Sequence, residues 1–256
     1  MDFAGKTAVV TGGASGLGRA TVEYFVEKGA NALVIDLNDD LGAELVAAHG
    51  GKVAYKKTNV ADEGEVTAAI NYAKEKFGSV DIAVNCAGIG TPQKVLDREG
   101  NRNPLAYFQK IIAVNLVGTY NVLSHAAEAM QANEPNADGE RGVIINTASV
   151  AAYEGQIGQA AYSASKGGVV GLTLPVAREL ARSGIRVMTI APGFIHTPLF
   201  DGLPEAAVES LKEQVVFPKR LGQPAEYAKL AAHIVENAYL NGETIRMDAA
   251  ARMAPK

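Results

Sequence analysis

The chain has 256 residues, of which 48% are hydrophobic and 20% are charged, and its formal net charge is -4. This composition is ordinary for a globular α/β domain and excludes a disordered chain. The small negative charge provides no overall field for nucleic acid or acidic membranes, and no apolar run reaches the roughly 18 residues that a membrane-spanning helix needs.

Short apolar runs alternate with longer amphipathic segments along the chain. The first four runs are continuous rather than alternating, which is typical of strands buried on both faces of a parallel sheet. Strands are predicted at residues 7–10, 32–35, 52–55, 81–84, 143–145, 185–190 and 243–247. With helices between them, the sequence predicts an α/β fold: a single doubly wound, Rossmann-type domain over residues 1–256, with a seven-stranded parallel sheet flanked by helices.

Three helical segments carry further information. One opens at the glycines after the first strand and runs to about Lys28, and a long one is expected from Pro104 to Met130, followed by a polar loop. The segment from Gly158 to Arg182 contains Pro175, which predicts a bent or locally broken helix. Its many glycines and alanines suit the close approach of a neighbouring helix or subunit.

The first strand is followed by a glycine-rich turn, residues 11–18, with the sequence TGGASGLG. Glycines allow the backbone to turn tightly and approach a diphosphate, and free N–H groups at a helix N-terminus favour anions. Asp36 ends the second strand, 18 positions after Gly18, near the spacing at which an acid accepts ribose hydroxyls. A carboxylate there repels a 2′-phosphate, so NAD is predicted over NADP. The alternatives are a flexible glycine turn without a ligand and, for Asp36, a residue at the end of a strand that caps the following helix.

Tyr162 and Lys166 are four residues apart and therefore share one face of the predicted helix. A cation beside a phenol favours the phenolate, which could exchange a proton with a hydroxyl or carbonyl group. Ser149 lies at the end of the fifth strand, 13 residues before Tyr162, where its hydroxyl could donate to the same substrate oxygen. Taken singly, each residue reads more simply as structural; together they predict a catalytic site.

These motifs and three others resemble, in order, the short-chain dehydrogenase/reductase family over essentially the whole chain. The glycine turn matches T-G-x-x-x-G-x-G and Tyr162 to Lys166 matches Y-x-x-x-K. Residues 85–88 (NCAG) match N-x-A-G, residues 192–197 (PGFIHT) match P-G-x-x-x-T, and Asn115 lies in the expected long helix. The departure is Asn59-Val60, where the family commonly has Asp-Val beside the adenine.

The resemblance implies a role for each matched residue. Tyr162 is expected to be the general acid/base, Ser149 to polarise the substrate oxygen, and Lys166 to bind the nicotinamide ribose and lower the phenol pKa. Asn115 is expected to hold a water of the proton relay, and Cys86 to be a packed residue rather than a nucleophile. The residues expected at the cofactor are Gly12, Ser15, Gly16, Leu17, Gly18, Asp36, Asn59, Val60, Cys86, Ala87, Gly88, Tyr162, Lys166, Ile195 and Thr197.

The second half of the chain is similar to the type-2 3-hydroxyacyl-CoA dehydrogenases, notably at residues 141–156, 217–222 and 240–248. That resemblance implies NAD-dependent interconversion of short 3-hydroxyacyl-CoA and 3-ketoacyl-CoA, within lipid metabolism. A hydroxysteroid or xenobiotic alcohol dehydrogenase with the same catalytic residues is the alternative enzyme. A dinucleotide-binding scaffold is the non-enzyme alternative, disfavoured because a pure binder has no need of all four of Ser149, Tyr162, Lys166 and Asn115.

The segment from about 198 to 217 is expected to cover the substrate. Its apolar residues could line the pocket or form an amphipathic helix that packs on the body: Leu199, Phe200, Leu203, Val208, Leu211 and Val215. Gln156 could touch the acyl group or be a solvated loop residue, and Lys219 and Arg220 could meet CoA phosphates or lie at the surface. His196 is read as a loop residue, and the other histidines as structural.

The expected environment follows from what the chain lacks. Cys86 has no partner for an internal disulfide, and no signal or transit peptide is recognisable, so a cytoplasmic enzyme is predicted. No metal site, nucleic acid or membrane partner is expected. Helices rich in small residues and the family resemblance both suggest a homotetramer.

Overall fold

The computed structural model describes residues 1–198 and 205–255. Within these ranges, a seven-stranded parallel sheet has the strand order β3-β2-β1-β4-β5-β6-β7. Its strands are β1 (Thr7–Thr11), β2 (Asn31–Asp36), β3 (Val53–Lys57), β4 (Ile82–Asn85), β5 (Gly142–Thr147), β6 (Ile185–Pro192) and β7 (Thr244–Met247). The predicted doubly wound fold is confirmed, and each predicted strand is present within two residues of its expected ends.

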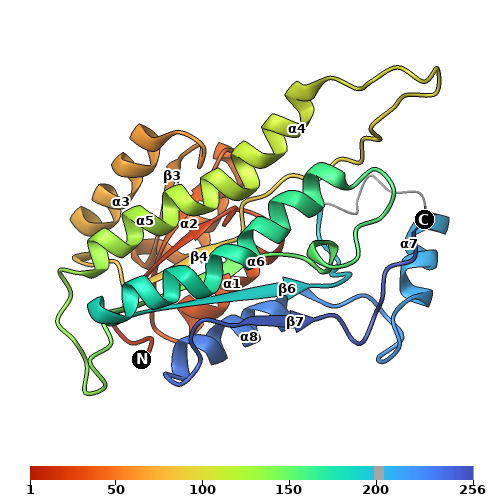
Figure 1. Cartoon of the computed structure of the whole chain (residues 1–256). Helices are drawn as coiled ribbons and strands as arrows, with labels where there is room; N and C mark the ends of the chain where they lie inside the picture. Colours follow the sequence, from red (N-terminus) through yellow and green to blue (C-terminus); the bar gives the residue numbers. More distant parts are fainter. Residues whose placement is uncertain (199–204, 256) are drawn as a thin grey trace.

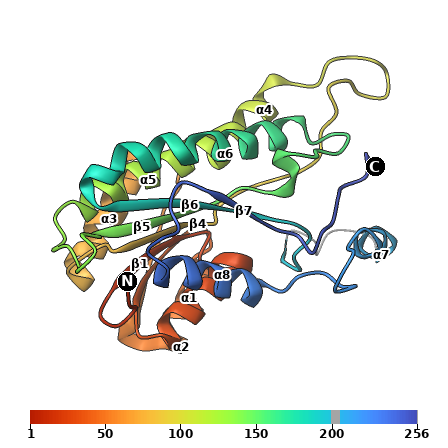
Figure 2. The ribbon, with the colours of Figure 1, turned by 60° about the horizontal axis from the view of Figure 1, so that its bottom comes forward.

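Helices cover both faces of the sheet (Figure 2). One face carries α1 (Gly16–Glu27), α2 (Asp39–His49) and α8 (Pro224–Glu236). The other carries α3 (Glu63–Phe77), α5 (Gly118–Met130) and α6 (Ala160–Leu180), while α4 (Leu105–Ile112) projects beyond the sheet and α7 (Glu205–Glu213) lies near the C-terminus (Figure 1). Because both faces are covered, the side chains of β1, β4, β5 and β6 are buried on both sides, which explains the continuous apolar runs in this part of the sequence.

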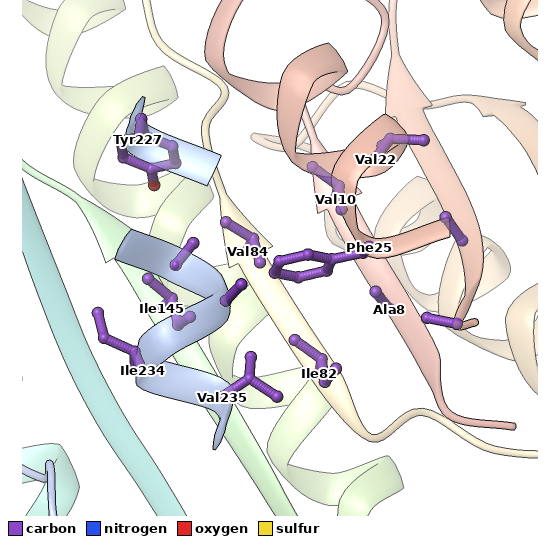
Figure 3. Close-up of a cluster of buried hydrophobic side chains, with 14 of the residues drawn as sticks. Ala8, Val10, Val22, Phe25, Ile82, Val84, Ile145, Tyr227, Ile234 and Val235 are labelled. Atoms are coloured by element: carbon purple, nitrogen blue, oxygen red, sulfur yellow. The ribbon is translucent and has the colours of Figure 1, made fainter. Parts of the chain in front are cut away.

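The core under α1 and α8 is made by alternate residues of the central strands (Figure 3). Phe25 of α1 and Tyr227 of α8 are both fully buried there, beside Val84 and Ile145 of the sheet. The opposite core is made by the intervening strand residues, such as Val9, with α3, α5 and α6. The period of two along each strand therefore divides one apolar run between two cores.

The predicted long helix over residues 104–130 is one continuous helical stretch with an irregularity. A π-helical turn, Ala113–Val117, joins α4 to α5, and Asn115 lies inside it. Helix α6 is not broken at Pro175, although a proline removes one hydrogen bond of the ladder. Thr173, Val176 and Ala177 on either side of it are buried, so packing against the sheet holds this part of the helix in place.

The strand order reverses beside β1, because the chain goes from β1 outward to β3 and then returns to place β4 on the other side of β1. The loops that follow β1 and β4 therefore meet at the carboxyl edge, where doubly wound sheets bind their ligands. A side chain on Gly12, after β1, would lie 2.9 Å from the backbone nitrogen of Ala87, after β4. Among the helices of residues 1–198 and 205–255, none has the length and apolarity to cross a membrane.

Candidate active site

A cleft of about 510 Å³ opens at the carboxyl edge of the sheet. Segments that follow six of the strands contribute to its lining, from the glycine turn after β1 to residues 192–198 after β6. The lining includes every residue that the sequence assigned to the cofactor: Gly12, Ser15, Gly16, Leu17, Gly18, Asp36, Asn59, Val60, Cys86, Ala87, Gly88, Tyr162, Lys166, Ile195 and Thr197. Ser149 lines it too, so positions from the whole length of the chain converge on one cleft.

The glycine turn has the geometry of a tight backbone cradle. Gly12 and Gly16 have φ angles of +59° and +51°, in the left-handed region that favours glycine. A side chain on Gly18 would lie 2.1 Å from the carbonyl oxygen of Gly12, so only glycine lets α1 begin so close to the turn. Ser15 precedes α1 in an extended conformation, and its side chain makes no capping hydrogen bond. The N-terminus of α1 therefore faces the cleft and suits an anion.

Asp36 connects the glycine turn to the end of β2. One carboxylate oxygen accepts a hydrogen bond from Ala14 N at 3.1 Å, and the other accepts from Leu37 N at 2.7 Å and Asn38 N at 3.1 Å. Its side chain also lines the cleft, so it could accept from a ribose hydroxyl there. Arg19, which follows the glycine turn, forms ion pairs with Glu23 and Glu44 at 2.9 and 2.8 Å. Its charge is therefore already neutralised by two carboxylates instead of being free to bind a 2′-phosphate.

Tyr162 and Lys166 lie in the first two turns of α6 and share a face, as predicted. The Lys166 ammonium is buried, 5.8 Å from the centre of the Tyr162 ring, and donates a hydrogen bond of 2.7 Å to the carbonyl oxygen of Thr147. The loop after β4 packs against this pair: added side chains on Gly88 and Gly90 would lie 3.5 Å from the Lys166 Nζ atom and 3.0 Å from the Tyr162 ring. The approach is tight at Gly90, whereas a side chain on Gly88 would make only an ordinary contact with Lys166.

Burial shifts both proton affinities, in opposite directions. It raises the pKa of the Tyr162 phenol, an effect that a hydrogen bond with Ser149 partly offsets. Burial also lowers the pKa of Lys166 to about 8. The expectation that Lys166 lowers the phenol pKa thus meets a stronger, opposing effect of burial, and the protein's own groups keep Tyr162 as a neutral phenol at neutral pH.

Ser149 caps the short 3-10 turn Val150–Ala152, and its oxygen accepts a hydrogen bond from Ala151 N at 3.1 Å. This contact fixes the side chain at the end of β5. Asn115 does not line the cleft. Its amide is buried, binding the backbone N and O of Ile89 at 2.8 and 2.9 Å and the Ser165 hydroxyl at 3.1 Å. It therefore fastens the loop after β4 to α6, while its expected part in a proton relay stays a prediction.

Cys86, which lines the cleft, belongs to a side-chain cluster that the sequence did not reveal. Its sulfur is 3.7 Å from both the Tyr227 and the Thr147 hydroxyl oxygens, and these two oxygens are 2.7 Å apart. Burial raises the pKa of the Cys86 thiol, consistent with a packed residue rather than a nucleophile. Thr147 thus has two functions, because its side chain joins this cluster and its carbonyl oxygen binds Lys166. In the sequence, only the position of Thr147 two residues before Ser149 pointed to it.

The side chain of Asn59, the departure from the family pattern, turns back on its own loop, because its oxygen accepts a hydrogen bond from Ala61 N at 3.1 Å. Val60 and Asn59 still line the cleft, beside Thr58. Lys110 of α4 also reaches the cleft as an exposed cation. Sequence reasoning missed Thr58 and Lys110, since neither falls in a recognisable motif.

Several residues expected near the substrate have other partners. Gln156 does not line the cleft: its side chain donates a hydrogen bond of 3.0 Å to the carbonyl oxygen of Ala254. Arg220 is paired with Glu226 at 2.8 Å, and Lys219 donates to the carbonyl oxygen of Glu213 at 3.1 Å. His196 is exposed, as expected of a loop residue.

The apolar residues of the segment from about 198 to 217, which is expected to cover the substrate, fall into two groups. Leu199, Phe200 and Leu203 lie outside the described residues. Val208, Leu211 and Val215 belong to a small apolar cluster with Phe194, Leu221 and Ala251, where Val215 is 2% exposed. These three residues follow the second alternative, an amphipathic helix that packs on the body of the protein.

A second hollow, of about 590 Å³, lies at the opposite edge of the sheet, around the end of α8. Its lining includes His233 and Glu236, and none of the residues of the predicted motifs. No group of three or more potential metal ligands occurs among residues 1–198 and 205–255. The candidate catalytic residues Ser149, Tyr162 and Lys166 line the cleft at the carboxyl edge and not this second hollow.

The residues of the cleft fit a dinucleotide with a free ribose 2′-hydroxyl. Side chains on Gly12 and Gly18 would collide with neighbouring backbone atoms, so glycine is needed at both positions. The turn therefore presents its backbone, without side chains at these positions, to a diphosphate. Asp36 lies in the same cleft as this turn, and Lys166 and Tyr162 lie in it too. The arrangement can place a hydride acceptor beside a phenol and a serine hydroxyl, which is the chemistry of alcohol oxidation and ketone reduction.

Known proteins are similar to this chain over nearly its full length. The profile of the short chain dehydrogenase family matches residues 6–207. The chain is 54% identical over 252 residues to the 3-hydroxyacyl-CoA dehydrogenase type-2 of Bos taurus, covering 98% of this chain and 97% of that protein. Identity to the enzyme of the same name from Drosophila melanogaster is 52% over 249 residues, 97% of this chain and 98% of that protein.

A solved structure shares the architecture. The crystal structure of 3-hydroxyacyl-CoA dehydrogenase type-2 from Mycobacterium avium is 43% identical, has a TM-score of 0.93 and covers 98% of both chains. The similarity thus includes the sheet, the covering helices and the segments that follow them.

Proposed function

Because the chain belongs to the short-chain dehydrogenase family, we propose that this oxidoreductase uses NAD to interconvert short 3-hydroxyacyl-CoA and 3-ketoacyl-CoA. The observation that best supports this proposal is that Ser149, Tyr162, Lys166 and the glycine turn all line one cleft. High identity to several 3-hydroxyacyl-CoA dehydrogenases type-2 supports the acyl-CoA substrate.

In the proposed reaction, NAD supplies the hydride acceptor and, when oxidised, a positive charge that favours the phenolate. Tyr162 accepts the proton of the 3-hydroxyl group as the C–H bond is broken, and Ser149 donates a hydrogen bond to the oxygen that becomes the ketone. Lys166 is oriented by the Thr147 carbonyl and binds ribose hydroxyls. Ketone reduction is the reverse, with Tyr162 as the acid, and its raised pKa suits that direction.

Initial rates on a panel of substrates test this proposal. The expected result is high kcat/KM for acetoacetyl-CoA with NADH, and weaker turnover of a hydroxysteroid with NAD. A hydroxysteroid preferred over the acyl-CoA pair would instead favour the alternative enzyme. Binding of NAD without turnover of either class would favour the scaffold alternative.

The choice of NAD rests on Asp36 and is tested by Asp36→Asn. This change keeps an oxygen that can accept from Leu37 N and Asn38 N but removes the charge that repels a 2′-phosphate. We expect the preference for NAD over NADP to fall by about tenfold or more, the size of one charge-assisted hydrogen bond. An unchanged ratio of the two kcat/KM values would remove Asp36 from this role.

The proposed assembly is a homotetramer in the cytoplasm. Large apolar side chains are exposed along one helical stretch, including Phe108 of α4 and Tyr120 of α5, and Leu174 is exposed on α6. Such faces suit contacts with further copies of the chain. Light scattering should give four times the mass of one chain, and a monomer would contradict it. The single free thiol of Cys86 suits a reducing compartment.

A further inference from the structure

The C-terminal segment, residues 248–255, connects the loop that follows Ser149 to the chain that follows α7. From β7 it runs toward α7 (Figures 1 and 2). On one side it contacts the loop 150–157, which follows Ser149, and on the other it contacts residues 214–217, which follow α7. No hydrogen bond joins those two parts directly within the described residues.

Glu154 holds the segment to the serine loop. One of its carboxylate oxygens accepts hydrogen bonds from the Arg246 guanidinium at 2.9 Å and from Met253 N at 3.1 Å, and the other is 3.2 Å from Arg252 Nε. Further along, Gln156 binds the carbonyl oxygen of Ala254, and Ile157 N binds that of Pro255, both at 3.0 Å.

The same segment is bound to the chain after α7. Ala254 N donates to the side-chain oxygen of Gln214 at 3.0 Å, and Ala249 O accepts from Val216 N at 3.2 Å. Ala251 is 1% exposed and packs in the apolar cluster with Val215 and Phe194. Hydrogen bonds and apolar burial therefore both attach the segment on this side.

The backbone conformation at the start of the segment indicates that its contacts hold it in one conformation. Ala249 and Ala250 have φ angles of +51° and +60°, a region that residues with a side chain rarely adopt. Such a conformation persists where the surrounding contacts over-determine it. Here those contacts are the hydrogen bond from Ala250 N to Asp248, at 3.1 Å, and the bonds of Ala249 O to the chain after α7.

We propose that residues 248–255 form a strap that couples the loop of the catalytic serine to the chain around α7, with Glu154 as the positioning residue that holds the strap. This inference rests on the proposed function only in one respect: the two coupled segments would be walls of the acyl-CoA site. Loosening the strap then weakens substrate binding while the cofactor side of the cleft is unchanged.

Hydrogen exchange, followed by mass spectrometry on the whole protein, tests the coupling in Glu154→Gln. The change keeps the shape of the side chain and removes its charge. We expect roughly fivefold faster exchange in peptides from both 150–157 and 205–217, although Glu154 belongs to the first of them and its carboxylate binds Arg246 of β7 and the strap, not the second; fivefold is about 1 kcal/mol at 1.4 kcal/mol per tenfold. Faster exchange confined to 150–157 and the strap would overturn the proposal.

Two further variants sharpen this test. A chain ending at Ala251 lacks the contacts of residues 252–255 and should show the same pattern. The matched control is Glu236→Gln, which removes an exposed ion pair with Lys28 at 2.7 Å, at the opposite edge of the sheet, and should leave both peptides unchanged. Equal acceleration in the control would assign the effect to general destabilisation and reject the strap.

Steady-state kinetics supply the functional readout. In Glu154→Gln we expect KM for acetoacetyl-CoA to rise about fivefold, with kcat within twofold of the wild type and an unchanged Kd for NADH. An equal loss in kcat or in NADH affinity would contradict the positioning role. If no acyl-CoA is turned over even by the wild type, the proposed function fails, and the exchange pattern alone decides on the strap.

Discussion

At the scale of single residues, burial is the main cause of the pKa shifts of both Tyr162 and Lys166. Burial disfavours both the phenolate and the ammonium, so it raises the pKa of one group and lowers that of the other. The proton affinities of a phenol and an amine thereby change in opposite directions. In the proposed reaction, the positive charge of the oxidised cofactor would then favour the phenolate of Tyr162 and so decide whether Tyr162 accepts or donates the proton.

The change Tyr162→Phe removes the phenolic oxygen and leaves the ring that packs against Gly90. Loss of a general acid/base costs about 100- to 10,000-fold in rate, so we expect kcat to fall by that amount while the Kd for NADH and the melting temperature change little. Tyr239→Phe, whose side chain is fully exposed beside the hollow at the end of α8, is the control and should keep its activity. Substantial turnover by Tyr162→Phe would exclude the phenol from catalysis.

Lys166 predicts how stability depends on pH. Its pKa is about 8 in the folded protein and near its usual value of 10.5 when unfolded, so between these values the unfolded chain binds more protons. The free energy of unfolding therefore rises with pH across this window, on the order of 3 kcal/mol for the group. Below pH 8 Lys166 is protonated in both the folded and the unfolded state, so the free energy of unfolding no longer changes with pH through this group.

The comparison with Lys166→Met isolates this effect, because methionine cannot titrate. In urea unfolding without cofactor, the stability of the wild type relative to Lys166→Met should increase from pH 8 to pH 10 and stay constant from pH 6 to pH 7.5. A difference that is flat throughout would mean that the native ammonium keeps an ordinary pKa.

At the scale of elements, the position of α1 against β1 depends on the absence of side chains. Gly18 is buried in the first turn of α1, and an added side chain would overlap the backbone of Gly12 and Gly13. The helix would have to move away from the turn, which changes the cradle that faces the cleft. The glycine pattern is therefore a packing requirement as much as a binding signature.

Two glycine-to-alanine changes separate these effects. Gly18→Ala should destabilise the protein by about 3 kcal/mol or more and abolish measurable NADH binding, since the helix cannot approach the turn. Gly171→Ala, in α6, places its side chain where no atom lies within 4 Å, so the better helix propensity should stabilise by about 0.5–1 kcal/mol. Thermal melts and NADH titrations measure both; a well-tolerated Gly18→Ala would refute the close-packing argument.

At the scale of the whole molecule, one buried ion pair joins distant segments of the edge opposite the cleft. Arg186 of β6 binds Glu140, in the loop before β5, with 2.8 Å between Nε and the carboxylate. The guanidinium also donates to the carbonyl oxygens of Ile234, Val235 and Leu240 at the end of α8 and beyond. Both side chains are less than 10% exposed, so water cannot replace a missing partner.

Glu140→Gln leaves the buried guanidinium without its counter-charge. Removing one partner of a buried pair costs about 3–5 kcal/mol, so the urea midpoint should fall markedly. Glu236→Gln, which breaks the exposed pair with Lys28, should leave the urea midpoint nearly unchanged. Similar midpoints for the two variants would show that Glu140 and Arg186 do not form a desolvated pair in solution.

The sequence by itself determined the fold class and the composition of the cleft. Apolar runs such as the one around Val9 are local signals, and the order of strands and helices restricts the topology because parallel strands need crossovers. The motif residues follow strand ends, and strand ends meet at one edge. Gly12, Asp36 and Tyr162 could therefore be assigned to one site before any distance was known.

Only the tertiary structure decided what each side chain contacts. The pairing of Gln156 with Ala254, the bond of Lys166 to Thr147 and the embedding of Asn115 against Ile89 join positions far apart in the sequence, which no local pattern encodes. Desolvation likewise depends on the atoms around a group, so the sequence spacing of Tyr162 and Lys166 could not predict their opposite pKa shifts. Local periodicity sets the elements, whereas burial and long-range contacts set the chemistry.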